Sequence, residues 1–190
     1  LLRRMPEYQS TILRREWTSF SPIRSINGSH VVIIGTGDIG TNTAVRMKAL
    51  GAKVTGVSRT GKSGDDSSFE KVVKVDQIDD VLPDADIVVL AVPETKMTKG
   101  LMSKSRIEMM KKSAFLINVG RGSAVDQDAL IQALKNGDIS GAALDVMTPE
   151  PLPNESTLWD CPNTIITPHV SGDMALGKTC DLVVEMFCRD

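Results

Sequence analysis

Aromatic residues, histidines and cysteines are scarce in this sequence. Aromatic side chains make up 4% of its 190 residues, and it has two histidines and three cysteines. The cysteines, Cys161, Cys180 and Cys188, are odd in number and lack the paired spacing of a metal site. They predict reduced thiols in a cytoplasmic protein rather than a disulfide framework, and no metal centre is expected.

The chain also lacks long apolar runs and an excess of either charge. No run approaches the roughly 18 consecutive apolar residues of a membrane span, so we expect no membrane partner. Lysine and arginine number 22 against 24 for aspartate and glutamate, which leaves a net charge of −2 and no basic stripe for nucleic acid. The 41% of hydrophobic residues and the length suit one globular domain, or slightly more.

Short apolar runs and amphipathic segments alternate along the chain. β-Branched runs are typical of buried strands, and Gly51 and Gly137 each follow a segment with helical periodicity. This alternation predicts an α/β fold with a Rossmann-type doubly wound parallel sheet. Strands are predicted at residues 30–34, 53–57, 72–75, 86–90, 114–118, 140–146 and 164–166, and helices at 7–17, 38–50, 104–111 and 126–136, the first with Tyr8, Ile12 and Leu13 on its apolar stripe.

Residues 35–40 read Gly-Thr-Gly-Asp-Ile-Gly, a G-x-G-x-x-G pattern between a predicted strand and a predicted helix. In such a loop Gly35 permits the tight turn, Gly37 lets a pyrophosphate approach the backbone, and Gly40 lets the helix pack closely on the strand. Glycine-rich turns also join strands to helices where no ligand binds. The strand–loop–helix–strand context favours a dinucleotide site.

The end of the second predicted strand bears on which dinucleotide binds. NAD-specific sites place an acidic residue there for the ribose 2′-hydroxyl, whereas residues 58–62 read Ser-Arg-Thr-Gly-Lys and no carboxylate follows until Asp65. A hydroxyl and a guanidinium favour a 2′-phosphate through charge-assisted hydrogen bonds. The alternative is that Arg59 and Lys62 are solvated loop charges. We expect NADP(H) to be favoured over NAD(H).

Three further segments place polar groups after predicted strands, at the edge where open parallel sheets bind ligands. Residues 118–122 read Asn-Val-Gly-Arg-Gly, residues 145–152 read Asp-Val-Met-Thr-Pro-Glu-Pro-Leu, and residues 167–172 read Thr-Pro-His-Val-Ser-Gly. With these motifs in order, the sequence from about Ile26 onward resembles the cofactor-binding domain of the D-isomer-specific 2-hydroxyacid dehydrogenases, glyoxylate/hydroxypyruvate reductases among them.

The resemblance implies three catalytic residues, Arg121, Glu150 and His169. Arg121 would bind the carboxylate of a 2-oxo acid and polarise its carbonyl. His169 would donate a proton to the carbonyl oxygen as hydride reaches C2, and take it back in the oxidative direction. Glu150 would orient His169 and keep its ring protonated near neutral pH. Asp145 resembles the family's aspartate near the nicotinamide carboxamide.

Each of these residues also has a plainer interpretation. Arg121 lies between two glycines, as a turn residue would, and Glu150 lies between two prolines, as a solvated loop charge would. An isolated histidine such as His169 is more often structural than catalytic. Their joint position at strand ends beside a dinucleotide loop favours catalysis. His30, before the first strand, is expected to be structural.

The loop, the strand ends and the resemblance together predict a cofactor site. The expected partner is a small-molecule 2-oxo acid, in a homodimer formed through the cofactor domain. The predicted cofactor-binding residues are Gly35, Gly37, Asp38, Ile39, Gly40, Ser58, Arg59, Thr60, Lys62, Val92, Pro93, Val119, Gly120, Arg121, Asp145, His169 and Gly172.

The sequence departs from the two-domain pattern that the resemblance implies, because a second domain normally supplies much of the substrate pocket. We divide the chain into an interdomain crossover helix and linker (residues 1–25), a dinucleotide-binding domain (26–178) and the start of a helix that returns to a missing substrate domain (179–190). The chain is then expected to be a fragment that binds cofactor and is poorly active by itself.

The expected activity is hydride transfer between NADPH and a 2-oxo acid or D-2-hydroxy acid, with glyoxylate or hydroxypyruvate as candidate substrates. One alternative is a dinucleotide-sensing interaction module of the corepressor type, which the presence of Arg121, Glu150 and His169 does not exclude. Another, an adenosylhomocysteinase-type cofactor domain, is disfavoured by the order of the three residues. Turnover of 2-oxo acids by the full-length chain separates an enzyme from an interaction module.

Overall fold

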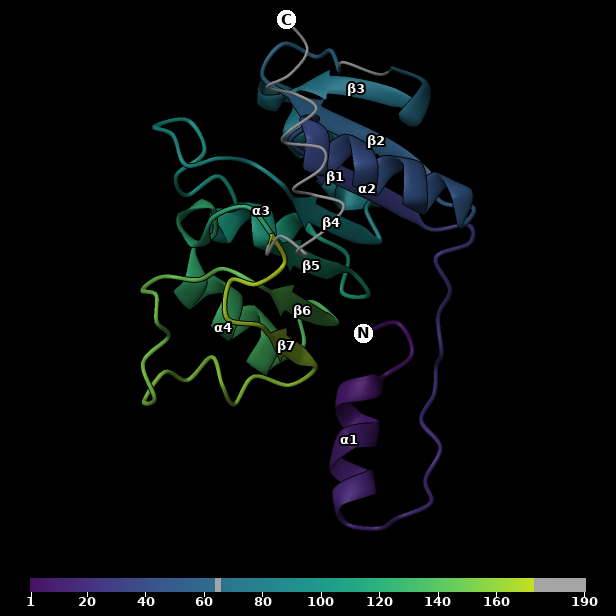
Figure 1. Cartoon of the computed structure of the whole chain (residues 1–190), viewed down its shortest axis with the longest axis vertical. Coiled ribbons are helices and arrows are strands. Elements are labelled where there is room, and N and C mark those ends of the chain that lie inside the picture. Colours follow the sequence, from purple (N-terminus) through teal and green to yellow (C-terminus); the bar gives the residue numbers. More distant parts are fainter. Residues whose placement is uncertain (64–65, 173–190) are drawn as a thin grey trace, which may run out of the picture.

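A seven-stranded parallel sheet forms the centre of the computed structural model, which describes residues 1–63 and 66–172 (Figure 1). The strand order is β3-β2-β1-β4-β5-β6-β7, so the direction of winding reverses at β1, which pairs with both β2 and β4. This is the predicted doubly wound sheet, whose switch point is where such folds bind ligands. The strands are β1 (His30–Ile34), β2 (Lys53–Ser58), β3 (Lys71–Lys74), β4 (Ile87–Leu90), β5 (Phe115–Asn118), β6 (Gly141–Leu144) and β7 (Thr164–Ile166).

Alternate side chains of β1 enter two separate cores on the two faces of the sheet. Val32 belongs to the larger core, together with Ile107 and Leu130 from the helices of one face. Val31 belongs to the smaller core with Ala44, which comes from a helix on the other face. Because both faces are covered, the central strands are apolar without interruption.

The described residues form four α-helices and four short 3₁₀ helices, of which all but α1 lie between strands. Among the described residues, no helix combines the length and the apolar character needed to cross a bilayer. The α-helices are α1 (Met5–Leu13), α2 (Asp38–Ala49), α3 (Lys104–Met109) and α4 (Gln127–Asn136), and the 3₁₀ helices are η1 (Asp66–Ser68), η2 (Val75–Asp80), η3 (Leu82–Asp84) and η4 (Gly122–Ala124).

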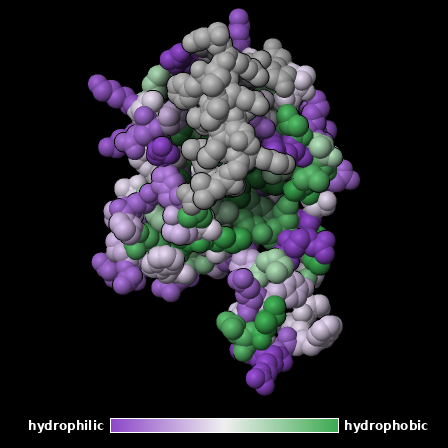
Figure 2. Space-filling view, viewed as in Figure 1, coloured by the Kyte–Doolittle hydropathy of each residue, from purple (hydrophilic) through white to green (hydrophobic). Residues whose placement is uncertain are grey.

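The prediction for the first helix is wrong in its bounds. The helix spans Met5–Leu13 rather than 7–17, and it ends before Arg15, which adopts the left-handed φ of 57°. Ile12 and Leu13 of the predicted apolar stripe are 65% and 85% exposed. The reason is placement: α1 projects from the body of the domain (Figure 1), and apolar side chains remain on the surface of this projection (Figure 2).

Other predicted boundaries differ by one to a few residues. The predicted strand 72–75 lies at Lys71–Lys74, because Val75 already begins η2. The predicted helix 104–111 ends at Met109, since Met110 has an extended backbone. The predicted strand 140–146 shortens to Gly141–Leu144. The predicted returning helix at 179–190 lies outside the described residues.

Gly40→Ala is expected to destabilise the domain by about 1–3 kcal/mol. A Cβ at Gly40 would overlap the carbonyl oxygen of Gly35 and lie 3.3 Å from Cγ2 of Ile33, so α2 would have to move away from β1. Gly37→Ala is the matched control, because a Cβ there meets nothing within 4 Å and its φ is −78°. Urea unfolding followed by circular dichroism measures both variants. Unchanged stability of Gly40→Ala would contradict this close packing.

Candidate functional site

A cavity of about 620 Å³ lies at the carboxyl ends of β1, β2 and β4. This volume is in the range of small-molecule sites, and the position is the switch point of the sheet. The cavity brings together predicted site residues from three separate sequence segments. The predicted cofactor-binding residues in its lining are Gly35, Gly37, Ser58, Arg59, Thr60, Lys62, Val92 and Pro93.

The glycine loop leaves the N-terminus of α2 open to an anion. Gly37 is the N-cap residue and no side chain caps the helix, so the first N–H groups of α2 have no side-chain acceptor from this position. Gly35 has a φ of 103° and a Cβ there would overlap the carbonyl oxygen of Ala91. The loop therefore lies directly on the end of β4 and presents its backbone to the cavity, as a phosphate cradle requires.

A hydrogen-bonded turn carries the predicted 2′-phosphate residues. The Ser58 hydroxyl donates to the Lys62 carbonyl at 2.8 Å and accepts from the Lys62 N–H at 3.0 Å. Thr36 adds a hydrogen bond to the same carbonyl at 3.3 Å. Arg59 is exposed on this turn, and within the described part of the chain no carboxylate pairs with it or with Lys62. Their positive charges are thus available to a ligand in the cavity.

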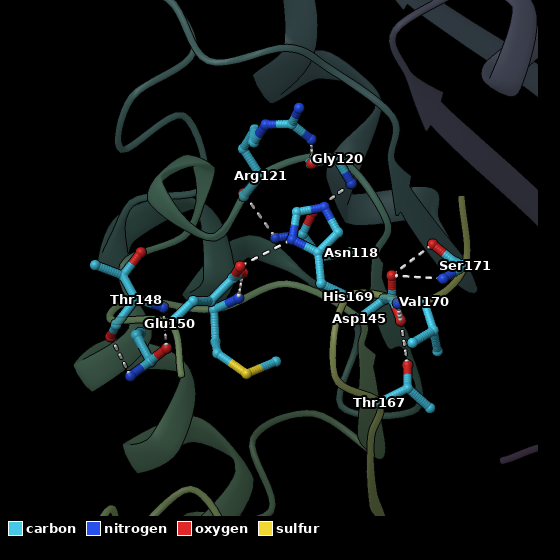
Figure 3. Close-up of polar contacts among 12 residues, drawn as sticks. Asn118, Gly120, Arg121, Asp145, Thr148, Glu150, Thr167, His169, Val170 and Ser171 are labelled. Carbon is cyan, nitrogen blue, oxygen red and sulfur yellow. Dashed lines mark hydrogen bonds and ion pairs between the residues drawn. The ribbon is translucent and has the colours of Figure 1, made fainter. Parts of the chain in front are cut away.

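His169 and Glu150 form a hydrogen-bonded pair at the same edge of the sheet (Figure 3). Nδ1 of His169 lies 2.8 Å from Oε2 of Glu150, and the Met147 N–H donates to Oε1 at 2.9 Å. Burial raises the pKa of Glu150, but these hydrogen bonds and the nearby charge of Arg121 outweigh it and leave the pKa below its ordinary value. Glu150 is therefore a carboxylate that holds Nδ1, and Nε2 is the ring nitrogen left for a substrate.

Asp145 holds the loop that carries His169. It is 4% exposed, and Oδ1 accepts from the Thr167 hydroxyl at 2.5 Å and the Val170 N–H at 3.0 Å. Oδ2 accepts from the Ser171 N–H at 2.9 Å and the Ser171 hydroxyl at 2.6 Å. Burial alone raises the pKa of Asp145, but these hydrogen bonds lower it to about 2. His169 lies within this loop with a left-handed φ of 58°, and its N–H donates to the Asp145 carbonyl at 2.8 Å.

Asn118 holds the backbone on which Arg121 is placed. Its side chain is buried at the end of β5, donates to the Arg121 carbonyl at 3.0 Å and accepts from the Gly120 N–H at 3.1 Å. The Arg121 guanidinium is exposed and donates to the Gly120 carbonyl at 2.7 Å. No described carboxylate forms an ion pair with Arg121. Figure 3 shows the side chains of Arg121 and His169 at one edge of the sheet.

The structure does not bring every predicted cofactor residue to the cavity wall. Asp38 and Ile39 are exposed on the first turn of α2, outside the lining, and Gly172 is exposed with open space around it. Gly40 is buried under the loop rather than in the cavity. Gly120 lies against the wall, because a Cβ there would be 2.6 Å from the Val92 carbonyl oxygen.

The sequence interpretation missed the residues that hold these groups in place. Asn118, Thr167 and Ser171 lie inside the quoted motifs but were given no role of their own. Gln127, which contacts the loop before Glu150, lies in a helix for which only apolar periodicity was considered. For Asn118, Thr167 and Ser171, the available signal was that each is a polar residue within four positions of a candidate catalytic residue. His30, expected to be structural, has both ring nitrogens within hydrogen-bond distance of partners, at 2.9 Å from Thr55 Oγ1 and 3.2 Å from the Asp84 carbonyl.

The fold and the open glycine loop define a dinucleotide-binding α/β domain, and the neighbouring strand ends add a His–Glu pair and an arginine to it. The family model "D-isomer specific 2-hydroxyacid dehydrogenase, NAD binding domain" matches residues 1–171. The chain therefore belongs to the D-isomer specific 2-hydroxyacid dehydrogenases, as the strand-end motifs predicted, and represents their cofactor-binding domain.

Individual relatives agree with this family. The chain is 41% identical over 145 residues to a glyoxylate reductase of Pyrococcus horikoshii, covering 76% of this chain and 42% of that protein. It is 36% identical over 180 residues to a glycerate dehydrogenase of Methylorubrum extorquens, covering 90% and 54%. A solved D-isomer specific 2-hydroxyacid dehydrogenase from Xanthobacter autotrophicus, in complex with NADPH and MES, matches with a TM-score of 0.81 at 34% identity, covering 97% and 75%. The chain spans about half the length of the curated relatives it matches.

Asp145→Asn is expected to lower the free energy of unfolding at pH 7 by about 2 kcal/mol, because the pKa of Asp145 falls from 3.8 to about 2 in the folded chain. Because the pKa is lower in the folded chain, the carboxylate stabilises the fold at pH values above its ordinary pKa of 3.8. This contribution is lost as the pH falls toward 2. The deficit of the variant should therefore shrink between about pH 4 and pH 2. Denaturant unfolding across this range measures it, with the exposed Asp80→Asn as control. If the loss of stability in Asp145→Asn did not change with pH, the lowered pKa of Asp145 would be contradicted.

Proposed function

We propose that this chain is the cofactor-binding half of a two-domain enzyme that transfers hydride between NADPH and a 2-oxo acid. The observation that carries the proposal is the 2.8 Å contact between His169 and Glu150 at an edge that also presents Arg121. Carbonyl reduction of a 2-oxo acid needs a proton donor for the carbonyl oxygen and a cation for the carboxylate. These three side chains supply both.

A dinucleotide fits the residues present, because the uncapped end of α2 and the open space at Gly37 suit a pyrophosphate. We assign its binding to the 35–40 loop, the 58–62 turn, Val92 with Pro93, and Val119 with Gly120. When bound, the nicotinamide supplies the hydride for reduction and accepts it in oxidation. Asp145 already accepts four hydrogen bonds, so we assign it to holding the 167–171 loop at this edge.

The chain's own residues then have distinct tasks in the reduction. Arg121 binds the substrate carboxylate and polarises the adjacent carbonyl. His169 gives the proton on Nε2 to the carbonyl oxygen while Nδ1 stays hydrogen-bonded to Glu150. Glu150 stabilises the imidazolium before the transfer and keeps the neutral ring oriented afterwards. In the oxidative direction His169 takes the proton from the hydroxyl.

Glyoxylate and hydroxypyruvate are the proposed substrates. Two relatives, a glyoxylate reductase and a glycerate dehydrogenase, support small acids of this kind. The His169 and Glu150 side chains are 47% and 35% exposed, so we propose that a second domain covers this edge during turnover. Residues 1–190 alone are then expected to bind NADPH and to turn over substrate slowly.

The proposed cellular context is cytoplasmic, and the proposed partner is a second copy of the chain. The two copies are proposed to meet through the cofactor domain, and the segment that precedes it (residues 1–25) adds exposed apolar side chains: Ile12, Leu13 and Trp17 are 65%, 85% and 105% exposed. Apolar surface of this kind on a soluble domain marks association sites.

NADPH is expected to bind at least about tenfold more tightly than NADH, because Arg59 and the 58–62 turn face the cavity without a competing carboxylate. Arg59→Ala should reduce this preference and leave NADH affinity nearly unchanged. Arg3→Ala, another exposed arginine outside the cavity, is the control. Isothermal titration calorimetry with both cofactors measures the ratio. Tighter binding of NADH to the parent chain would overturn the assignment.

His169→Ala in the full-length protein is expected to lower kcat for glyoxylate or hydroxypyruvate by about 10²–10⁴-fold with little change in NADPH affinity, because the proton donor is lost.

Glu150→Gln should lower the pH above which reduction slows, because the carboxylate that stabilises the imidazolium is removed. Loss of NADPH absorbance across a pH series measures both. Absence of turnover of any 2-oxo acid by the parent would favour the interaction module over the enzyme.

A further inference from the structure

We propose that Gln127 is a positioning residue that holds Glu150 against His169, a role that rests on the proposed function. Gln127 is the first residue of α4, and its carboxamide contacts the backbone of Thr148 twice. Nε2 donates to the Thr148 carbonyl at 2.8 Å, and Oε1 accepts from the Thr148 N–H at 3.0 Å. We call these two hydrogen bonds the Gln127 clamp.

The clamp acts on a segment that has no regular structure of its own. Residues 145–152 follow β6 without forming a helix or strand. Asp145 still makes backbone hydrogen bonds with Asn118 and His169, but no backbone–backbone hydrogen bond is described for residues 146–152. Thr148 lies two residues before Glu150 and next to Met147, whose N–H donates to Glu150 Oε1 at 2.9 Å. Fixing the backbone at Thr148 therefore limits where the Glu150 carboxylate can lie.

The other end of the clamp lies in a capped helix turn. Asp126 caps α4 by accepting from the Ala129 N–H at 3.1 Å, which holds the first turn that carries Gln127. A Cβ at Gly122 would overlap the Met147 carbonyl oxygen, so the segment that follows Arg121 also lies directly against this loop. Arg121, proposed to bind substrate, and Glu150, proposed to orient His169, thus both belong to segments that pack against the loop held by Gln127.

The chemistry of the clamp is specific to a carboxamide of this length. A primary amide offers a donor and an acceptor side by side, which matches the C=O and N–H of one backbone residue. Glutamate keeps the acceptor and loses the donor, and alanine loses both. Gln132 on the same helix is exposed and has no hydrogen bond among the described contacts, so it provides a matched control of the same residue type.

The tautomer of His169 reports on the clamp without cofactor or substrate. Glu150 accepts from Nδ1, so the neutral ring in the parent chain should carry its proton mainly on Nδ1. Long-range ¹H–¹⁵N spectra above the imidazole titration distinguish the tautomers. The two histidines of the chain are assigned with His169→Asn. Gln127→Ala is expected to lower the Nδ1–H fraction at least about twofold, Gln127→Glu to lower it less, and Gln132→Ala to leave it unchanged.

An unchanged Nδ1–H fraction in Gln127→Ala overturns the proposal, and so does an equal loss in Gln132→Ala. If Gln127→Ala does not fold, the Nδ1–H fraction of Gln127→Glu tests the proposal instead. This variant is expected to fold, because a carboxylate is favoured at a helix N-terminus. In the full-length protein, Gln127→Ala should lower kcat roughly three- to tenfold and shift its pH profile as Glu150→Gln does, with the KM for NADPH unchanged. Because the spectra need no turnover, the clamp and the proposed activity can fail independently.

Discussion

The carboxylate of Asp145 holds the loop on which the candidate catalytic edge depends. A buried anion is costly unless hydrogen bonds satisfy it, and here all four donors come from the 167–171 loop that carries His169. The left-handed backbone of His169 lies between these donors. The position of the histidine, which follows β7, is therefore set by a charge that follows β6. Without that charge the loop would lose these four hydrogen bonds and keep the backbone hydrogen bonds that Thr167 and His169 make to the end of β6.

Two carboxylates at this edge differ in environment and thus in what they can do. Asp145 is 4% exposed and accepts from backbone and hydroxyl groups, whose charge does not change over the range of physiological pH. The Glu150 side chain is 35% exposed and accepts from an imidazole, which does change. Asp145 therefore acts as a fixed support. Glu150 responds to the protonation state of His169, and that response is what acid–base chemistry at this edge requires.

The features that were predicted from sequence are those that leave a local pattern. Apolar runs and the 35–40 glycine loop specified the sheet and its cavity, and the strand-end motifs located the edge where Glu150 and His169 meet; the roles of these two residues stay predictions. The bounds of the first helix were mispredicted, and the exposure of Ile12 and Leu13 was not predictable, because amphipathicity indicates a face that can be buried, not one that is. The Gln127 clamp joins residues 21 positions apart by a side chain-to-backbone contact, which produces no periodicity in the sequence.

The exposure of the His–Glu pair bears differently on the proposed cofactor binding and on the proposed catalysis. The groups proposed to hold the dinucleotide lie on one sheet, so affinity for it depends on contacts that this domain makes alone. The polarisation proposed for Arg121 and the proton transfer proposed for His169 would both be favoured where water is excluded, since an ion pair open to solvent contributes only about 0–1 kcal/mol. His169 at 47% exposed has water on one side. A surface that closes over this edge would raise the strength of both interactions without changing any residue of the domain, and the rate, unlike the affinity, would then be governed by that closure.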